Sequence, residues 1–503
     1  MAQGFLPFQY ETERGSSSAT SHAGLMLYVE LFQALGLRKA IEKEVGVRRE
    51  TLGYSDWQVV LSLLLLNLAG GECVSDLDVL EGDQGFCKAY RAVENHGLQR
   101  RERRELGDRF PEGRARTLPS SSATFRYLAG FHTAVGGPEV KGAYIPPAPA
   151  PLQGLRRVNG QVLSRAQKHR RSRTATLDLD ATLDETWKRE AKYCYKHFKA
   201  YQPLNVYWWE QELVVHSEFR DGNVPAGFEL RRVLAEALTY LPAGVDQVYL
   251  RSDSAGYDHE LLGYCDDGKK ERFGRIEFAV SCDVTPQFKA AVVQVPEEEW
   301  GPLYREEKGK KIATGREWAE VCFVPNRLCS KKRGREYRYL ATREALSQPP
   351  LPGLAEQLDL PFPTMTMNAT SYKIFGVVTN RDLPGAELIL WHDQRSGRSE
   401  EAHAVMKNDL AGGTLPSGDF GENAAWWMIM ILAFNLHTAM KRLALGPSWA
   451  RSRIKALRFH LINLPGRVLR HAGRLIIRLP GDHPSFDLLL AARGRILALA
   501  RAP

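Results

Sequence analysis

Residues 174–182 read TATLDLDAT, a stretch in which leucine and aspartate alternate. Side chains of a β-strand alternate between its two faces, so Leu177 and Leu179 share one face while Asp178 and Asp180 share the other. Two aspartates inside an otherwise apolar strand are costly to bury unless cations compensate them. The stretch therefore predicts either a central strand that brings carboxylates to cations or a strand end that faces solvent.

Helices and strands follow this stretch in a recognisable order. Residues 205–219, NVYWWEQELVVHSEF, are rich in β-branched and aromatic side chains and predict two strands. Residues 229–241 predict a helix, 245–253 a strand, 257–265 a helix and 275–284 a strand. Three strands, a helix, a strand, a helix and another strand is the order of an RNase H-like α/β core with a mixed sheet.

Size and charge narrow the class of protein. The 503 residues exceed what one hydrophobic core usually supports, and 44% hydrophobic content is ordinary for a soluble globular protein. A formal net charge of +9 is compatible with a polyanionic partner, because neutralised phosphates release their counterions. The sequence contains no G-x-x-x-x-G-K-[ST] loop, so chemistry driven by a nucleotide cofactor is not indicated.

The cysteines and the apolar segments favour an intracellular protein. The seven cysteines form no C-x-x-C pair, which favours reduced thiols. The N-terminus lacks the pattern of a signal peptide. The apolar runs from Val59 and from Ala424 are shorter than the ~20 residues of a bilayer-spanning helix, so both predict buried core helices without membrane contact.

Two further acids stand at places where ligands commonly bind. Asp253 ends the predicted strand VYLRSD at a sheet edge, although it is as well placed to cap the following helix. In RSGRSEEAHAVMKNDL, residues 395–410, Glu400 and Lys407 are seven apart, so two helical turns put them on one face, with Arg395 upstream. An acid for a metal and cations for phosphates suit phosphodiester chemistry, while an amphipathic surface helix explains the same residues.

The order of the three acids favours the first interpretation. An acid on the first strand, an acid ending the fourth and a glutamate on a later helix can converge at one sheet edge. Three such carboxylates hold two divalent ions about 3.5–4 Å apart, which activate a water or hydroxyl and stabilise the leaving oxygen.

These motifs, together with SEEAHAVMKNDLAGGTLPSGDFGENAAWWMIMILAFNL and the long insertion before it, resemble the DDE transposases of bacterial insertion sequences. The similarity is strongest to insertion-sequence family thirteen-eighty, which is distantly related to the piggyBac enzymes, and it covers roughly residues 25–500. It implies that Asp180, Asp253 and Glu400 are catalytic and bind two Mg²⁺ ions, which Mn²⁺ can replace. Asp180 is chosen because the family form is an aspartate followed by a small residue and threonine.

The resemblance also assigns supporting roles. Arg395 and Lys407 match the family's basic residues and are expected to contact DNA phosphates, with Arg395 one residue further from the glutamate than is usual. Trp391 stands near the family's tyrosine. Asp178 and Glu401 remain supporting or alternative acids.

The function implied is that of a transposase. Such an enzyme binds the terminal inverted repeats of its mobile element as a homodimer, cleaves the DNA ends and joins them to double-stranded target DNA, in the bacterial cytoplasm at the nucleoid. A metal-dependent nuclease without strand transfer and a domesticated, non-catalytic DNA-binding protein are the alternatives.

The arginines from Arg100 to Arg116 are candidate phosphate contacts or a solvated connector. Trp300 and Trp318 are candidates for stacking on a flipped base, although core packing explains them better.

Composition shifts divide the chain further. The helical pattern of residues 25–95, the proline-rich segment from Tyr144 and the strand-like pieces among basic clusters after residue 300 mark the boundaries. We expect an N-terminal helical DNA-binding domain (1–143), a linker and basic lead-in (144–173), the first part of the catalytic core (174–300), a β-rich insertion (301–370), the second part of the core (371–445) and a basic, helical C-terminal region (446–503).

Overall fold

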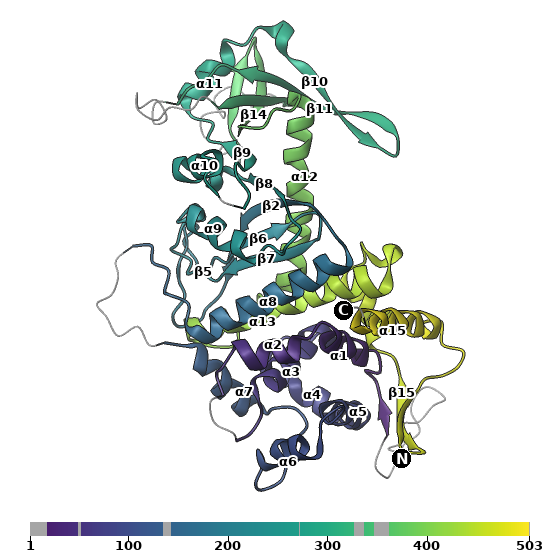
Figure 1. The fold of residues 1–503 in the computed structure, drawn as a ribbon. Helices are drawn as coiled ribbons and strands as arrows, with labels where there is room; N and C mark the ends of the chain where they lie inside the picture. The colour runs from purple at the N-terminus through teal and green to yellow at the C-terminus, as the bar shows by residue number, and fades with distance from the viewer. Residues whose placement is uncertain are drawn as a thin grey trace, which may run out of the picture.

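A large mixed sheet forms the upper half of the molecule and a helical body forms the lower half (Figure 1). The structure is a computed structural model. It describes residues 18–48, 52–133, 142–270, 272–325, 337–346 and 362–501.

Five strands make up the core of the sheet: β2 (Thr174–Ala181), β6 (Leu204–Trp208), β7 (Leu213–Glu218), β8 (Gln247–Ser252) and β9 (Glu277–Cys282). Their spatial order is β7-β6-β2-β8-β9. β6 pairs antiparallel with β2, and β7 pairs antiparallel with β6. β8 lies parallel to β2, and β9 lies parallel to β8. This is the predicted RNase H-like order, so the expected fold class is confirmed.

Helices make the two parallel crossovers. α9 (Leu230–Tyr240) connects β7 to β8, and α10 (His259–Asp266) connects β8 to β9. Both helices bury leucines against the apolar face of the core strands, to which Leu177 and Leu179 also contribute. The opposite face of β2 carries Asp178 and Asp180, as the period of two predicted.

Five further strands extend the core sheet. β10 (Gly301–Glu307), β11 (Lys310–Val321), β12 (Arg338–Ala345) and β13 (Thr364–Met367) lie in the predicted insertion, and β14 (Thr370–Thr379) lies almost wholly in the predicted second part of the core. β14 pairs antiparallel with β9, and the order continues outward through β12 and β11 to β10, with β13 also paired to β14. The core and the insertion therefore share one continuous ten-stranded sheet.

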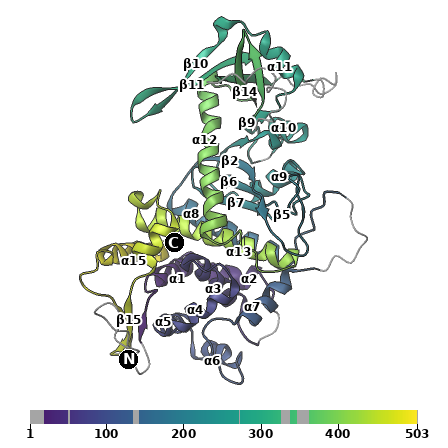
Figure 2. The same ribbon diagram turned by 180° about the vertical axis from the view of Figure 1, so that it is seen from behind.

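A long helix, α12 (Gly385–Ala404), runs along the sheet from the insertion to the helical body (Figure 2). It contacts β11 and β10 near its start and β9, β8 and β2 further along. A π-helical turn, η5 (Val405–Asp409), follows it directly. α12 thus carries its side chains past the ends of the core strands.

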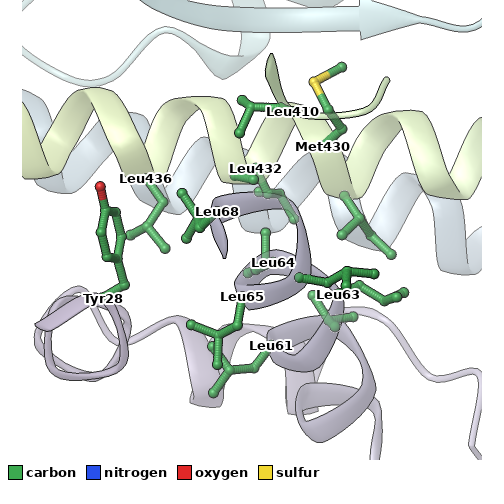
Figure 3. Packing of buried hydrophobic residues seen from close by; sticks show 14 of the residues in the cluster. Tyr28, Leu61, Leu63, Leu64, Leu65, Leu68, Leu410, Met430, Leu432 and Leu436 are labelled. Carbon is green, nitrogen blue, oxygen red and sulfur yellow. The ribbon is translucent and has the colours of Figure 1, made fainter. Parts of the chain in front are cut away.

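The helical body is organised around α13 (Phe420–Ala439), which is buried on all sides. α1 (Leu25–Ala34) and α3 (Asp56–Ala69) pack beneath it, and Figure 3 shows leucines of α3 meeting leucines of α13. The body also contains α2 (Leu37–Glu44), α4 (Leu77–Gly82), α5 (Gln84–Glu94), α6 (Arg100–Asp108) and α7 (Ser121–Leu128).

α13 is longer than its apolar sequence run indicated. With the turn that follows, it spans 26 residues, Phe420–Leu445, and by length and composition alone it could cross a membrane. The most apolar part of this helix is 83% buried inside the protein. The interpretation that this run is too short to span a bilayer was therefore wrong, while its place in the core agrees with the prediction.

Two segments differ from the predicted organisation. Residues 150–169, expected in a linker and basic lead-in, form the helix α8 (Ala150–His169), which packs against α13 and α2. Proline is tolerated at the start of a helix because the first N–H groups have no partner within the helix, and Pro151 stands in the first turn of α8. The C-terminal region contains a hairpin, β15 (Gly466–His471) and β16 (Arg474–Arg478), which pairs with β1 (Ala19–Thr20), before α15 (Phe486–Arg501) packs on α1.

Candidate active site

Asp180 and Asp253 leave neighbouring strands at the same edge of the sheet. β2 and β8 are parallel and Leu179 is in register with Ser252, so the next residue of the first strand and the next of the second lie side by side. Burial raises the pKa of the Asp253 carboxyl, and the neighbouring Asp180 carboxylate raises it further. The sheet therefore brings two mutually repelling carboxylates together, as the order of the acids predicted.

α12 presents three polar side chains to Asp180. Ser399 Oγ donates a hydrogen bond to Asp180 Oδ2 at 2.6 Å. Arg395 Nη1 and His403 Nδ1 lie 3.6 Å and 3.8 Å from the same oxygen. The three residues are spaced by four, which puts them on one stripe of the helix.

Arg395 is the arginine that pairs with Asp180 in the described part of the chain. Its charge also opposes the rise in the pKa of both Asp253 and Asp178. Its Nε atom is buried and has no hydrogen-bond partner among the described residues. Arg395, which was predicted to contact DNA phosphates, thus lies at the carboxylates, and its Nε–H donor has no partner among the described residues.

Asp178 has a different environment from Asp180. Its carboxylate accepts hydrogen bonds from Arg251 Nε at 2.7 Å and Nη2 at 2.9 Å, and neither side chain is exposed. Arg251 Nη1 also donates to the carbonyl of Trp391 on α12, at 2.6 Å. Burial raises the pKa of Asp178 and the Arg251 guanidinium opposes that rise. Because Arg251 already occupies its oxygens, Asp178 is a structural acid here.

The two glutamates of α12 point in different directions. Arg398 pairs with Glu212 Oε1 at 3.0 Å in the β6–β7 turn, which lies at the amino end of β2. Successive helical residues turn by about 100°, so Glu400 stands on the opposite side of the Ser399 stripe from Arg398. Glu401 instead lines a cavity of about 400 Å³ that also includes Lys441. Both glutamates are exposed, but the charge of Glu400 acts on His403 at the site, whereas that of Glu401 acts on Lys441.

Lys407 does not share a regular helical face with Glu400. α12 ends at Ala404, and Lys407 lies in the π-helical turn, where the α-helical period no longer applies. Its Nζ donates to the carbonyl of Leu183, two residues after β2, at 2.5 Å. The expectation of two regular turns was wrong, but the lysine still reaches the end of the strand that carries Asp180.

Three residues of this site were not predicted: Ser399, His403 and Asn205. Asn205 stands opposite Asp180 on β6, and its Nδ2 lies 3.3 Å from His403 Nε2. Ser217 Oγ donates to Asn205 Oδ1 at 2.7 Å. Burial lowers the pKa of His403, and Asp180 opposes that effect. The spacing of four between Arg395, Ser399 and His403 could have placed all three on one face of a helix beside Asp180. The sequence could not have identified Asn205, because strand register is not visible in it.

The donor set suits a hard divalent cation. Asp180 and Asp253 offer carboxylate oxygens, which Mg²⁺ prefers, and their mutual repulsion favours a cation between them. In the described part of the chain, no three side chains of the His, Cys, Asp and Glu types are grouped closely enough to hold one ion together. Glu400 would therefore have to move toward the aspartates to join them at a metal.

Comparisons with known proteins identify the family to which the chain belongs. Residues 11–501 match the family described as "Transposase DDE domain group 1". No curated protein sequence matches the chain. Among solved structures, the chain is similar to a cryo-EM structure of a piggyBac transposase synaptic complex with hairpin DNA, at 10% identity, over 88% of this chain and 80% of that one, with a TM-score of 0.42. Because the family match spans nearly the whole sequence, the chain belongs to the DDE transposase domain family, group 1.

Proposed function

We propose that this protein is an active transposase that cleaves the ends of its mobile element and joins them to target DNA. One observation carries the proposal: Asp180 and Asp253 lie side by side at the carboxyl ends of β2 and β8, next to the helix α12 that carries Glu400. The family supports the reaction class, and the positions of Asp180 and Asp253 support the choice of residues.

Asp180, Asp253 and Glu400 would hold two Mg²⁺ ions in this proposal. When bound, these ions supply the polarisation of the phosphodiester and the activation of the attacking water or 3′-hydroxyl. Ser399 fixes the Asp180 carboxylate by its hydrogen bond, and His403, held by Asn205, lies against the same oxygen. These contacts keep the acid in one rotamer, which is what positioning of a reactive phosphate requires.

Arg395 and Lys407 would assist at the phosphates. Arg395 balances the carboxylate charge in the absence of other cations, and cations at the acids would free its guanidinium for a phosphate. Lys407 contacts the start of the segment that follows β2, and it adds positive charge to the end of this strand, where Asp180 lies. Double-stranded DNA is the proposed partner, bound by a homodimer in the bacterial cytoplasm.

Incubation of the purified protein with the DNA that flanks its own gene tests the proposal. In Mg²⁺, we expect nicks at the element ends and, with a supercoiled plasmid as target, covalent joining of those ends. Asp180→Asn should abolish both reactions while leaving DNA binding intact. Cleavage without joining would indicate a nuclease, and binding without cleavage a non-catalytic DNA-binding protein; either result would refute the proposal.

A further inference from the structure

A small sheet follows β2 along the chain, at the end of the strand where Asp180 lies. It consists of β3 (Asp184–Glu185), β4 (Lys192–Tyr193) and β5 (Lys199–Tyr201), in the order β3-β5-β4. Asp184 stands four positions after Asp180, a span of at most about 14 Å. We call residues 184–201 the aromatic hairpin. It begins beside the site already described and takes no part in the chemistry assigned above.

This hairpin exposes large aromatic rings. Trp187 is 86% exposed, Tyr193 64% and Tyr195 70%. Within the described ranges, only Phe459, at 78%, is an aromatic residue of comparable exposure elsewhere. Rings of this size usually bury most of their area, so three exposed rings within nine residues indicate a surface that meets a partner.

The same segment is positively charged. It contains five lysines and arginines, Lys188, Arg189, Lys192, Lys196 and Lys199, against three acids, Asp184, Glu185 and Glu190. Two of the acids face inward. Burial raises the pKa of Asp184 to about 6, and the Glu190 carboxylate accepts a hydrogen bond from the backbone N–H of Phe420 at 2.6 Å. Arg189 is paired with Asp419 outside the hairpin, which leaves four lysines against Glu185, so the charge presented to solvent is mainly cationic.

Contacts with the body of the protein hold the hairpin in place. The backbone N–H of Lys192 donates to Asp221 Oδ1 at 2.9 Å. The Tyr201 ring is buried and packs on Phe219, with their centroids 4.7 Å apart. A Cβ on Gly222 would come within 2.6 Å of the hairpin backbone, so the two segments touch directly. The exposed rings thus stand on a fixed support, which lowers the entropy cost of binding.

We infer that the aromatic hairpin is a stacking platform for unpaired DNA bases next to the active site. This inference rests on the proposed function, since it assumes DNA at the carboxylates. Aromatic rings stack on bases only where the base faces are free, which excludes the interior of a duplex, and neighbouring lysines neutralise the phosphates of the same strand. The combination of exposed rings and cations on one segment fits a single strand.

The tryptophans considered in the sequence are poorer candidates. Trp300 is only 7% exposed, and the Arg343 guanidinium lies over its ring at 4.3 Å. Trp318 packs within a hydrophobic cluster that includes Leu340 and Leu388. Neither ring offers a free face comparable to that of Trp187, so the core-packing explanation holds for both.

The probe for the test is a fluorescein-labelled oligothymidylate of about 20 nucleotides, longer than the ~4–16 nucleotides that one single-strand binding module covers. A version with a central 2-aminopurine reports stacking through quenching, and a blunt duplex of equal length serves for comparison. Binding is measured in Ca²⁺. The triple variant Trp187→Ala, Tyr193→Ala, Tyr195→Ala should bind the single strand roughly 5- to 150-fold more weakly for each base that loses its ring, and should lose the quenching. Its affinity for the duplex should change much less.

Two variants control for the fold and for exposure. Trp187→Phe with Tyr193→Phe and Tyr195→Phe keeps all three rings and should retain single-strand binding and quenching. Tyr304→Ala removes a ring that is 47% exposed on β10 and should have no effect. Undiminished single-strand binding by the triple alanine variant would overturn the inference, as would a change in oligomeric mass by light scattering with unchanged affinity, which would mark the surface as a protein interface. Failure of the wild-type protein to bind any DNA would instead refute the proposed function.

Discussion

Arg251 and Asp178 meet across β8 and β2 in a bidentate pair, with hydrogen bonds of 2.7 and 2.9 Å and no exposure of either side chain. The two residues stand in register on parallel strands. This pair neutralises the acid that precedes Asp180 on the same strand face. It explains how one strand carries two aspartates of which only the first has both oxygens occupied by a buried guanidinium.

The pair predicts a large loss of stability when one partner is removed. Asp178→Asn leaves the buried guanidinium without a compensating charge, which typically costs about 3–5 kcal/mol. Chemical denaturation monitored by circular dichroism measures the change. Asp246→Asn, which removes the acid from the exposed Arg173–Asp246 pair, is the matched control and should cost about 1 kcal/mol or less. Equal losses in the two variants would contradict the structural role of Asp178.

Glu400 and Glu401 should differ sharply in catalysis. Glu400→Gln should abolish cleavage and joining, because the charge of Glu400 acts on His403, which lies against Asp180, whereas Glu401→Gln should stay largely active. Gel assays of strand cleavage and strand transfer, with DNA binding measured in parallel, make the comparison. An inactive Glu401→Gln beside an active Glu400→Gln would show that Glu401, and not Glu400, serves the aspartate pair.

Divalent ions should affect both activity and stability. Cleavage should need Mg²⁺ or Mn²⁺ and cease in excess EDTA, while Ca²⁺ should support DNA binding with little cleavage. Binding to the folded state alone also stabilises it, so Mg²⁺ should raise the melting temperature of the wild-type protein and raise that of Asp180→Asn less. Full cleavage in EDTA would refute the two-metal proposal.

The acid at the start of the aromatic hairpin makes stability depend on pH. Burial raises the pKa of Asp184 from 3.8 to about 6, with Lys407 opposing the rise. The folded state therefore holds this proton more tightly than the unfolded state, and the stabilisation is complete below about pH 4 and lost as the pH rises through about 6. Asp221 has the same shift and adds to the effect.

Asp184→Asn should remove the contribution of Asp184 to the pH dependence of stability. Relative to wild type, the variant should gain up to about 3 kcal/mol of unfolding free energy between pH 4 and pH 8, since one pKa unit corresponds to about 1.4 kcal/mol. Urea denaturation across this pH range measures it. A pH dependence identical to that of the wild-type protein would mean that Asp184 is ionised in the folded state throughout.

The arginines of α6 should contribute to DNA affinity through charge alone. No residue of this helix is buried, and Arg101 and Arg104 pair only with exposed acids one turn away. Replacing Arg100, Arg101, Arg103 and Arg104 by alanine should flatten the dependence of log affinity on log salt by about 0.9 for each phosphate that the protein no longer neutralises. An unchanged slope would identify the helix as a solvated connector.

The sequence predicted most of the core strands and both crossover helices, because apolar alternation and helical spacing are local properties. It did not predict α8, because a proline-rich start resembles a linker until the burial of the following helix is known. Nor did it separate Asp178 from Asp180, since the difference lies in Arg251, which reaches Asp178 only through the pairing of β2 with β8. The π-helical turn at Lys407 likewise depends on packing between distant segments rather than on residue spacing.

The burial of α13 has a consequence for damaged copies of the gene. The N-terminal helices, α8 and the C-terminal segment all cover this one helix, and their buried side chains form a single cluster with it. A deletion at either end of the reading frame would leave a long apolar helix facing water, and the remaining chain would aggregate or be degraded. We therefore expect truncation to abolish DNA binding and catalysis together, so that decay of the element yields no protein fragment able to occupy its ends and repress an intact copy.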